Sequence, residues 1–213
     1  MSGEPAVSSD SVALDGRALG RRGQQTRTRL LEATAQMLER VGLRDLRVVD
    51  IARVVGTSPA TFYQYFRDVE DAVLALAVEA AEDLSPVSRA LAEPWTDTSA
   101  RRIVEAFVVS WDAHRAVLRV RNLAAQEGDQ RFRTARLASL RPITEALAAR
   151  VAESQQAGRV SPDVSPIAAA SAMVAMTERV AAFHREIEDL GVGPDALIAT
   201  TARIIDQTVT GPS

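Results

Sequence analysis

The sequence predicts an all-α protein that has a small N-terminal helical domain and a larger C-terminal helical domain. Apolar residues recur at helical spacing through most of the 213 residues, and no stretch shows the alternation of a half-buried strand. Gly and Pro stand where these helices would begin or end. Arginine is concentrated near the N-terminus, whereas the remainder of the chain is acidic. Together these observations predict two helical domains of different character.

We expect three parts along the chain. Residues 1–20 are punctuated by Gly, Ser and Pro without periodicity, which indicates a flexible arm that ends in basic residues. Residues 21–67 form the small helical domain, and residues 68–213 form the large one.

The small domain contains three predicted helices. "TRTRLLEATAQMLERVG" is a first amphipathic helix that ends at Gly42, and "RVVDIARVVG" is a second that ends at Gly56. Ser58 is an expected N-cap followed by Pro59 at the first helical position, which opens a third helix running to Phe66. Because the turn between the last two helices is so short, they must cross steeply. This is the helix-turn-helix arrangement.

Four of the nine aromatic residues of the chain fall within positions 62–66. Helical spacing places Phe62 and Phe66 on the inner face of the third helix, and it turns Tyr63 outward together with short or polar side chains. Those neighbours are Ala60, Thr61 and Gln64. Such an outer face can enter a major groove about 12 Å wide, where Thr and Gln bond base edges and Tyr bonds phosphate.

Charge supports the same interpretation. Residues 17–67 hold ten Arg against four acidic residues, whereas residues 68–213 hold 15 Arg against 21 acidic residues. A basic block joined to an acidic remainder is typical of a nucleic-acid reader attached to a second domain. The alternative is a solvated Arg-rich face. Four arginines that precede or open the first helix could follow the DNA backbone or enter a minor groove: Arg17, Arg21, Arg22 and Arg27.

Several other functions are disfavoured by what the chain lacks. It has no Cys, and its two histidines, His114 and His184, lie 70 residues apart, so they are expected to be ordinary residues rather than metal ligands. No Gly-rich phosphate loop or Ser-His-Asp spacing is present. We therefore expect no enzyme activity and no cofactor. Without an apolar run of about 18 to 20 residues or a signal peptide, we expect a cytoplasmic protein with no membrane partner.

The stretch "RLLEATAQMLERVGLRDLRVVDIARVVGTSPATFYQYFRDVEDAVLALA" resembles the DNA-binding domain of TetR-family (tetracycline-repressor-type) transcriptional regulators. The family pattern is matched in register over about 50 residues by these seven: Ile51, Ala52, Gly56, Ser58, Tyr63, Tyr65 and Phe66. The resemblance implies a homodimeric, ligand-responsive repressor whose third helix reads a double-stranded, palindromic operator. It carries the family's DNA contacts over to Thr57, Ser58, Ala60, Thr61, Tyr63 and Gln64.

Three positions depart from the family pattern. Arg47 stands where the family usually has a Ser or Thr that contacts phosphate, and it could do so more strongly as a charge. Ala60 replaces a common Gly. Val69 replaces a Lys that contacts the backbone, and Arg67 could take over that contact. Arg47 and Arg67 therefore join the expected DNA-binding residues.

The large domain is expected to begin with a helix capped by Asp68, followed by a break from Pro86 to Pro94. Pro142 predicts either a kink in a long helix or a gap in its hydrogen-bond ladder. Two final helices run from Pro166 to about Leu190 and from Pro194 to about Thr208. Their small and apolar faces predict a homodimer through these two helices, the alternative being core packing within one chain.

We expect the large domain to bind a mostly hydrophobic small molecule, because it holds bulky or pliable apolar residues in its middle and late helices. The expected ligand-binding residues are Phe107, Trp111, Met173, Met176, Thr177 and Phe183. Thr177 is included because its surroundings are similar to a polar patch of mycobacterial TetR regulators. An ordinary core is the alternative for the apolar members. Three arginines could also meet an acyl-CoA phosphate: Arg115, Arg119 and Arg121.

Two further functions stay open at this stage. The protein could activate rather than repress transcription, or it could be a ligand-independent helical protein-interaction module with an incidental basic face.

Overall fold

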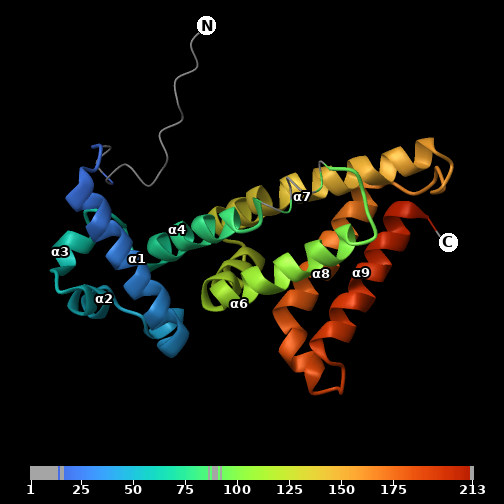
Figure 1. Ribbon diagram of the computed structural model, residues 1–213. Coiled ribbons are helices and arrows are strands. Elements are labelled where there is room, and N and C mark those ends of the chain that lie inside the picture. Colours follow the sequence, from blue (N-terminus) through green and yellow to red (C-terminus); the bar gives the residue numbers. More distant parts are fainter. Residues whose placement is uncertain (1–13, 15–16, 86, 88–90, 92, 212–213) are drawn as a thin grey trace, which may run out of the picture. The chain divides into compact units, whose positions relative to one another are not determined.

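The computed structural model describes residues 14, 17–85, 87, 91 and 93–211, and its elements are helices, as predicted (Figure 1). Most of the predicted arm over residues 1–20 lies outside the described residues. The helices are α1 (Arg21–Val41), the short 3₁₀ helix η2 (Leu43–Asp45), α2 (Val48–Val55), α3 (Pro59–Phe62), α4 (Val69–Glu82), α6 (Ser99–Gln126), α7 (Gln130–Gln156), α8 (Pro166–Glu188) and α9 (Pro194–Thr210). In the described part of the chain, no helix is long and apolar enough to cross a membrane.

The chain divides into two compact units. Unit 1 comprises residues 1–77 and 116–132, and unit 2 comprises residues 78–115 and 133–213. Helices α4, α6 and α7 each contribute residues to both units. The sequence analysis divided the chain by expected function, after residue 20 and after residue 67, whereas these units are defined by contacts. The predicted domain boundaries therefore stay predictions.

Unit 1 is built around the inner faces of α1, α2 and α3. Leu30, Ile51 and Phe62 are completely buried, and Phe66 is nearly so. The two phenylalanine rings pack with their centroids 5.5 Å apart. The predicted inward orientation of Phe62 and Phe66 is therefore confirmed, and these rings join α3 to the core.

Helix α3 is shorter than predicted, because it ends at Phe62 rather than at Phe66. After it, the N–H groups of Gln64 and Tyr65 donate to carbonyls three residues back, Thr61 at 3.2 Å and Phe62 at 2.9 Å. This tighter i→i+3 pattern turns residues 63–65 out of the α-helix while keeping Tyr63 and Gln64 next to it in space. Periodicity alone does not distinguish this turn from one more turn of helix.

In unit 2, α8 and α9 lie side by side (Figure 1). The start of α8 follows the prediction, because Ser165 Oγ accepts a hydrogen bond from the Ala168 N–H and Pro166 opens the helix. The buried apolar residues of α8 and α9 include Met173, Val174, Ala181, Ala202, Ile205 and Val209. The two predicted final helices are therefore present with nearly the expected bounds.

Helix α6 is interrupted at His114, whose backbone is non-helical at φ −126° and ψ 24°. The sequence did not indicate at which residue such an interruption would fall. The His114 Nε2 atom lies 2.7 Å from Asp83 Oδ2. Helix α7, in contrast, continues through Pro142. The missing proline N–H leaves a gap in its hydrogen-bond ladder, which is the second of the two predicted effects.

Candidate nucleic-acid interface

A tight turn of unit 1 connects α2 to α3. Gly56 has φ 73° and ψ 39°, a left-handed conformation that other residues adopt only with strain, and its N–H donates to the carbonyls that end α2. Two residues later Ser58 begins α3: its Oγ accepts a hydrogen bond from the Thr61 N–H at 3.2 Å. The predicted caps are confirmed, and together they set the angle at which α3 leaves the turn.

The side chains of α3 and its following turn divide by exposure. Phe62 is completely buried, whereas Tyr63 is 53% exposed although the two residues are adjacent. Ala60 and Gln64 are exposed, and Thr57 and Thr61 are partly exposed. The predicted outer face is therefore available to a partner, and it offers an amide, hydroxyls and a phenol.

One predicted contact residue already has hydrogen-bond partners. The Ser58 Oγ lies 3.0 Å from the Thr61 Oγ1 as well as accepting the capping bond. Ser58 thus holds the start of α3 in place. Its hydroxyl already has these two partners, so it can contact a ligand only with the hydrogen-bonding capacity that remains. Arg47 is the N-cap residue of α2 and is exposed, so its guanidinium is open to a phosphate, as expected.

Arg67, the last of the predicted DNA-binding residues, is paired with Asp71. Its guanidinium lies 2.6 Å from Asp71 Oδ1, and its backbone N–H donates to Asp71 Oδ2 at 3.1 Å. Burial on its own would raise the pKa of the Asp71 carboxyl, but the hydrogen bonds from Arg67 outweigh it and the pKa lies below its ordinary value. Any phosphate bound by Arg67 must therefore compete with this carboxylate.

Two arginines of α1 have roles that sequence reasoning missed. Arg27, expected to follow a DNA backbone, is instead buried, with its guanidinium 5.5 Å from the centre of the Phe66 ring. Arg29 reaches across to α2 and donates to the carbonyl of Val55, the last residue of that helix. A cation at a helix C-terminus is favourable, and Arg29 thereby fixes the end of α2 beside the turn. Both arginines contact residues far away in the sequence, and no local sequence pattern predicts such contacts.

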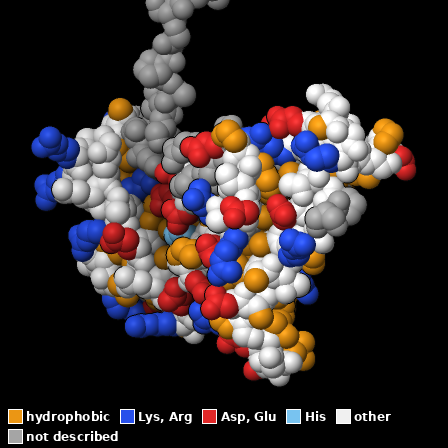
Figure 2. All heavy atoms as spheres, turned by 45° about the vertical axis from the view of Figure 1, so that its right-hand side comes forward, with side chains coloured by type: hydrophobic (Ala, Val, Ile, Leu, Met, Phe, Trp, Pro, Cys, Tyr) orange, Lys and Arg blue, Asp and Glu red, His pale blue; other side chains and the backbone are white. Residues whose placement is uncertain are grey.

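The exposed surface of unit 1 is rich in arginine, as the charge distribution predicted; its exposed arginines include Arg21, Arg22, Arg44, Arg47 and Arg53. Figure 2 shows blue arginine side chains that stand out along its left-hand side. The Leu14 N–H donates to the carbonyl of Gln64, in the turn after α3, at 3.1 Å.

The expected effector residues belong to unit 2. Phe107, Trp111, Met173 and Thr177 are buried, whereas Met176 and Phe183 are partly buried. The Thr177 hydroxyl donates to the Met173 carbonyl one turn earlier. On the following turn, the Arg179 guanidinium lies 3.6 Å from the centre of the Phe183 ring. Beside them, the nearly buried Glu178 pairs with Arg136 of α7. Between Met173 and Phe183, helix α8 therefore combines bulky apolar side chains with a few paired polar groups.

Two short helices joined by a tight, capped turn, with buried phenylalanines and an exposed polar face on the second, form the helix-turn-helix of a DNA-binding protein. Two family models match the chain. Residues 30–76 match the model described as bacterial regulatory proteins, tetR family, and residues 89–213 match the tetracyclin repressor-like C-terminal domain. The second match alone spans more than half of the chain. The chain belongs to the TetR family of transcriptional regulators, with a DNA-binding N-terminal domain and a ligand-binding C-terminal domain.

Solved structures share this fold. FadR of Bacillus halodurans, described as a fatty acid degradation regulator, aligns with a TM-score of 0.63 at 15% identity over 92% of this chain and 98% of that one. FadR of Bacillus subtilis, solved with stearoyl-CoA, aligns with a TM-score of 0.65 at 15% identity, covering 87% and 99%. GusR of Salmonella enterica aligns with a TM-score of 0.65 at 21% identity, covering 87% and 96%. No curated protein matches the chain.

Proposed function

We propose that this protein is a repressor that binds a palindromic DNA operator as a homodimer and responds to a mostly hydrophobic small molecule. The observation that carries the DNA-binding part is the division of α3 and its turn into buried phenylalanines and an exposed reading face. The expected contact residues remain those of the sequence analysis, with Tyr63 and Arg47 on phosphate and Thr61 and Gln64 on base edges. Acting on DNA, the protein would work in the cytoplasm.

Selection from random double-stranded DNA tests this proposal. The wild-type protein is expected to enrich a two-fold symmetric sequence with half-sites one helical turn apart, about 34 to 36 Å. Repeating the selection with Gln64→Ala should enrich a different base at one position of each half-site. A pool that stays random with the wild-type protein would favour the alternative of a protein-interaction module.

The effector class is supported by the composition of unit 2 and by the ligand of one structural neighbour. The Bacillus subtilis FadR was solved with stearoyl-CoA, and the buried Phe107, Trp111 and Met173 of this chain suit an acyl chain. We therefore propose long-chain acyl-CoA esters as the first ligands to test. The proposal requires that the ligand prefer one of two arrangements of the dimer.

Tryptophan fluorescence provides the test. In a Trp95→Phe background Trp111 is the only indole, and a bound acyl chain should shift or quench its emission. Trp95 Nε1 donates to Asp206 Oδ1 at 2.9 Å, so the melting temperature of this background must be compared with wild type first. The same ligand should change operator affinity, with repression or activation read from the direction in a reporter assay. Ligands that bind near Trp111 but leave operator affinity unchanged would contradict the coupling.

A further inference from the structure

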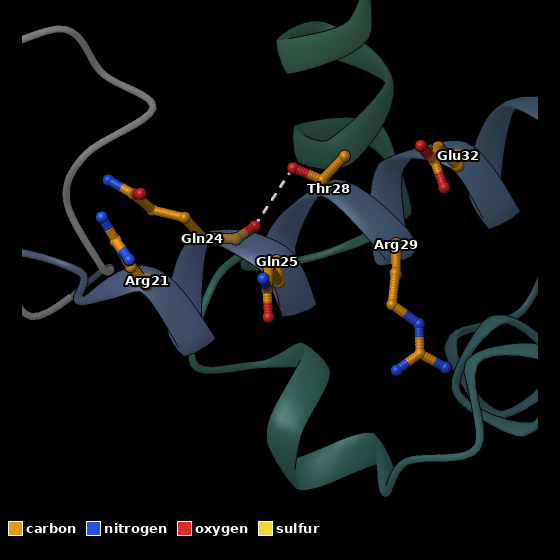
Figure 3. Close-up of a pocket in the computed structure, with 6 residues that line it drawn as sticks. All are labelled: Arg21, Gln24, Gln25, Thr28, Arg29 and Glu32. Atoms are coloured by element: carbon orange, nitrogen blue, oxygen red, sulfur yellow. Dashed lines mark hydrogen bonds between the residues drawn. The ribbon is translucent and has the colours of Figure 1, made fainter.

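The two histidines of the chain both lie beside aspartates of unit 2, and one of them, His184 on α8, is buried at 7% exposure. Its setting differs from that of the charged groups on α1, where Arg21, Arg29 and Glu32 line a hollow that is open to solvent (Figure 3). Charges interact more strongly where water is excluded. A change in the charge of His184 should therefore affect the packing around it.

The His184 ring has a backbone carbonyl on one side and a carboxylate on the other. Its Nδ1 atom lies 2.8 Å from the carbonyl oxygen of Ala181, one turn earlier in α8. Because a carbonyl oxygen only accepts hydrogen bonds, Nδ1 carries a proton in both charge states of the ring. The Nε2 atom lies 3.4 Å from Asp112 Oδ2 on α6. The bond to Ala181 thus determines that a neutral ring lacks its proton on Nε2, the side that faces Asp112.

Asp112 is shared by two consecutive residues of α8. Its Oδ1 atom accepts a hydrogen bond from the Arg185 guanidinium at 2.9 Å, while its Oδ2 atom faces His184. In the described part of the chain, Asp112 and Arg185 are the charged groups in contact with this ring or with its partner carboxylate. An arginine keeps its charge at all physiological pH values, whereas a histidine changes charge between about pH 5 and 8. His184 is therefore the member of this group that can respond to pH.

We propose that His184 and Asp112 form a proton-dependent ion pair that joins α8 to α6. When the ring is protonated, its Nε2–H faces the carboxylate and opposite charges attract. When the ring is neutral, the Nε2 lone pair faces Asp112 Oδ2, so two acceptors oppose each other and the attraction is lost. The pair therefore stabilises unit 2 at the lower end of this pH range, and the stabilisation is lost as pH rises.

The position of the pair gives it a role in regulation. Asp112 directly follows Trp111, and His184 directly follows Phe183, so the pair joins the two helices beside expected effector residues. A change in pH would act on these helices without any ligand. The ion pair itself does not depend on the proposed function, since it is a property of the single chain.

His114 provides an internal comparison. Its Nε2 atom lies 2.7 Å from Asp83 Oδ2. Among the described residues no hydrogen-bond partner holds a proton on the His114 Nδ1, so the neutral ring can carry its proton on Nε2 and still donate to Asp83. The contact of His114 can thus persist in both charge states, whereas that of His184 requires the second proton.

Nitrogen-15 NMR of the imidazole rings in the full chain tests the protonation states directly. The chain has two histidines, so His114→Gln assigns both sets of signals. His184 should carry protons on both nitrogens near the lower end of the range, about pH 5, and on Nδ1 alone near the upper end, about pH 8. A neutral His184 ring with its proton on Nε2 would overturn the proposal, because it could donate to Asp112 in both charge states.

A double-mutant cycle measures the strength of the pair. The unfolding equilibrium constants of wild type, His184→Gln, Asp112→Asn and the double variant are compared in urea at both pH values. The coupling should change this constant by at least about twofold at the lower pH, the lower bound for residues in contact, and it should vanish at the higher pH. Coupling that is equal at both pH values, or absent at both, would contradict the proposal.

The matched control is the cycle of Arg185→Gln with Asp112→Asn, which removes the other partner of the same carboxylate. Its coupling should be the same at both pH values, because the guanidinium does not lose its charge. If His184→Gln does not fold, the NMR measurement on the wild-type protein still decides whether the ring has the required protonation states.

Discussion

At the scale of single residues, the direction in which a ring points decides its role. Phe62 and Tyr63 are neighbours with rings 5.9 Å apart and nearly perpendicular, yet one is core and the other is surface. The cluster of aromatics in residues 62–66 serves two purposes: the phenylalanines hold α3 in the core of unit 1, and Tyr63 faces outward.

Tyr63→Phe removes one exposed hydroxyl and leaves the buried rings untouched. The melting temperature should stay at the wild-type value, while affinity for all DNA sequences should fall by about 1 to 2 kcal/mol, as for loss of a hydrogen bond to phosphate. Fluorescence anisotropy with the selected operator and with random DNA measures both effects. Tyr65→Phe is the control, because Tyr65 is only partly exposed. Full affinity in Tyr63→Phe would show that its hydroxyl does not contact DNA.

At the scale of elements, the shortness of α3 makes it depend on its cap. A helix of four residues has almost no hydrogen bonds of its own. Its position therefore comes from the Ser58 cap, the Gly56 turn and the burial of Phe62. The structure offers a matched comparison, since Ser165 caps α8 in the same way and is also followed by proline.

Ser58→Ala and Ser165→Ala each remove one N-cap, and each should destabilise the protein by about 1 kcal/mol. Only Ser58→Ala should also weaken operator binding, because the start of the reading helix loses its orientation. Thermal melts together with anisotropy distinguish the two variants. Equal operator affinity in both would mean that the turn and the core alone orient α3.

At the start of α4, Arg67 forms an ion pair with Asp71. The pKa of Asp71 is lower in the folded chain than its ordinary value near 3.8. This pairing therefore stabilises the fold above about pH 4, and the stabilisation is lost as pH falls through the lower, folded pKa.

Asp71→Asn should lower resistance to urea at pH 7, and its difference from wild type should shrink as pH falls and the Asp71 carboxyl of the folded protein becomes protonated. Urea melts at pH 7 and at a series of lower pH values test this. Arg67→Gln should destabilise the protein as Asp71→Asn does. At pH 7 the double variant should be little less stable than either single variant. A difference between wild type and Asp71→Asn that persists at low pH would assign the effect to packing instead.

At the scale of the whole molecule, α8 and α9 each have one face buried within the chain and one face exposed. Much of the apolar face predicted for self-association is buried within one chain, including Met173, Thr201 and Ile205. Two members of the predicted apolar faces stay exposed, Ala172 on α8 and Ile204 on α9, the latter 45% exposed. The proposed dimer contact is therefore best tested at these two positions.

Ala172→Arg and Ile204→Arg should each convert the dimer to a monomer without unfolding it, because both positions are exposed in the single chain. Sedimentation velocity measures the change, and operator affinity should fall with it, since one short reading helix contacts few base pairs. Val109→Arg, on an exposed position of α6, is the control. A dimer that persists in both α8 and α9 variants would place the contact elsewhere.

The helix-turn-helix could be predicted from the sequence alone, including the caps at Gly42, Gly56 and Ser58, the inward Phe62 and Phe66, the outward Tyr63, and the family. Local signals suffice there, because a cap or a turn depends on residues within four positions of one another. Tertiary packing was needed to show the early end of α3, the interruption of α6 at His114, and the partners of Arg27, Arg29 and Arg67. Arg29 and Val55 lie 26 residues apart, so only the packing of α1 on α2 makes them neighbours. Likewise, the packing of the rest of unit 2 decides which faces of α8 and α9 are buried and which are exposed.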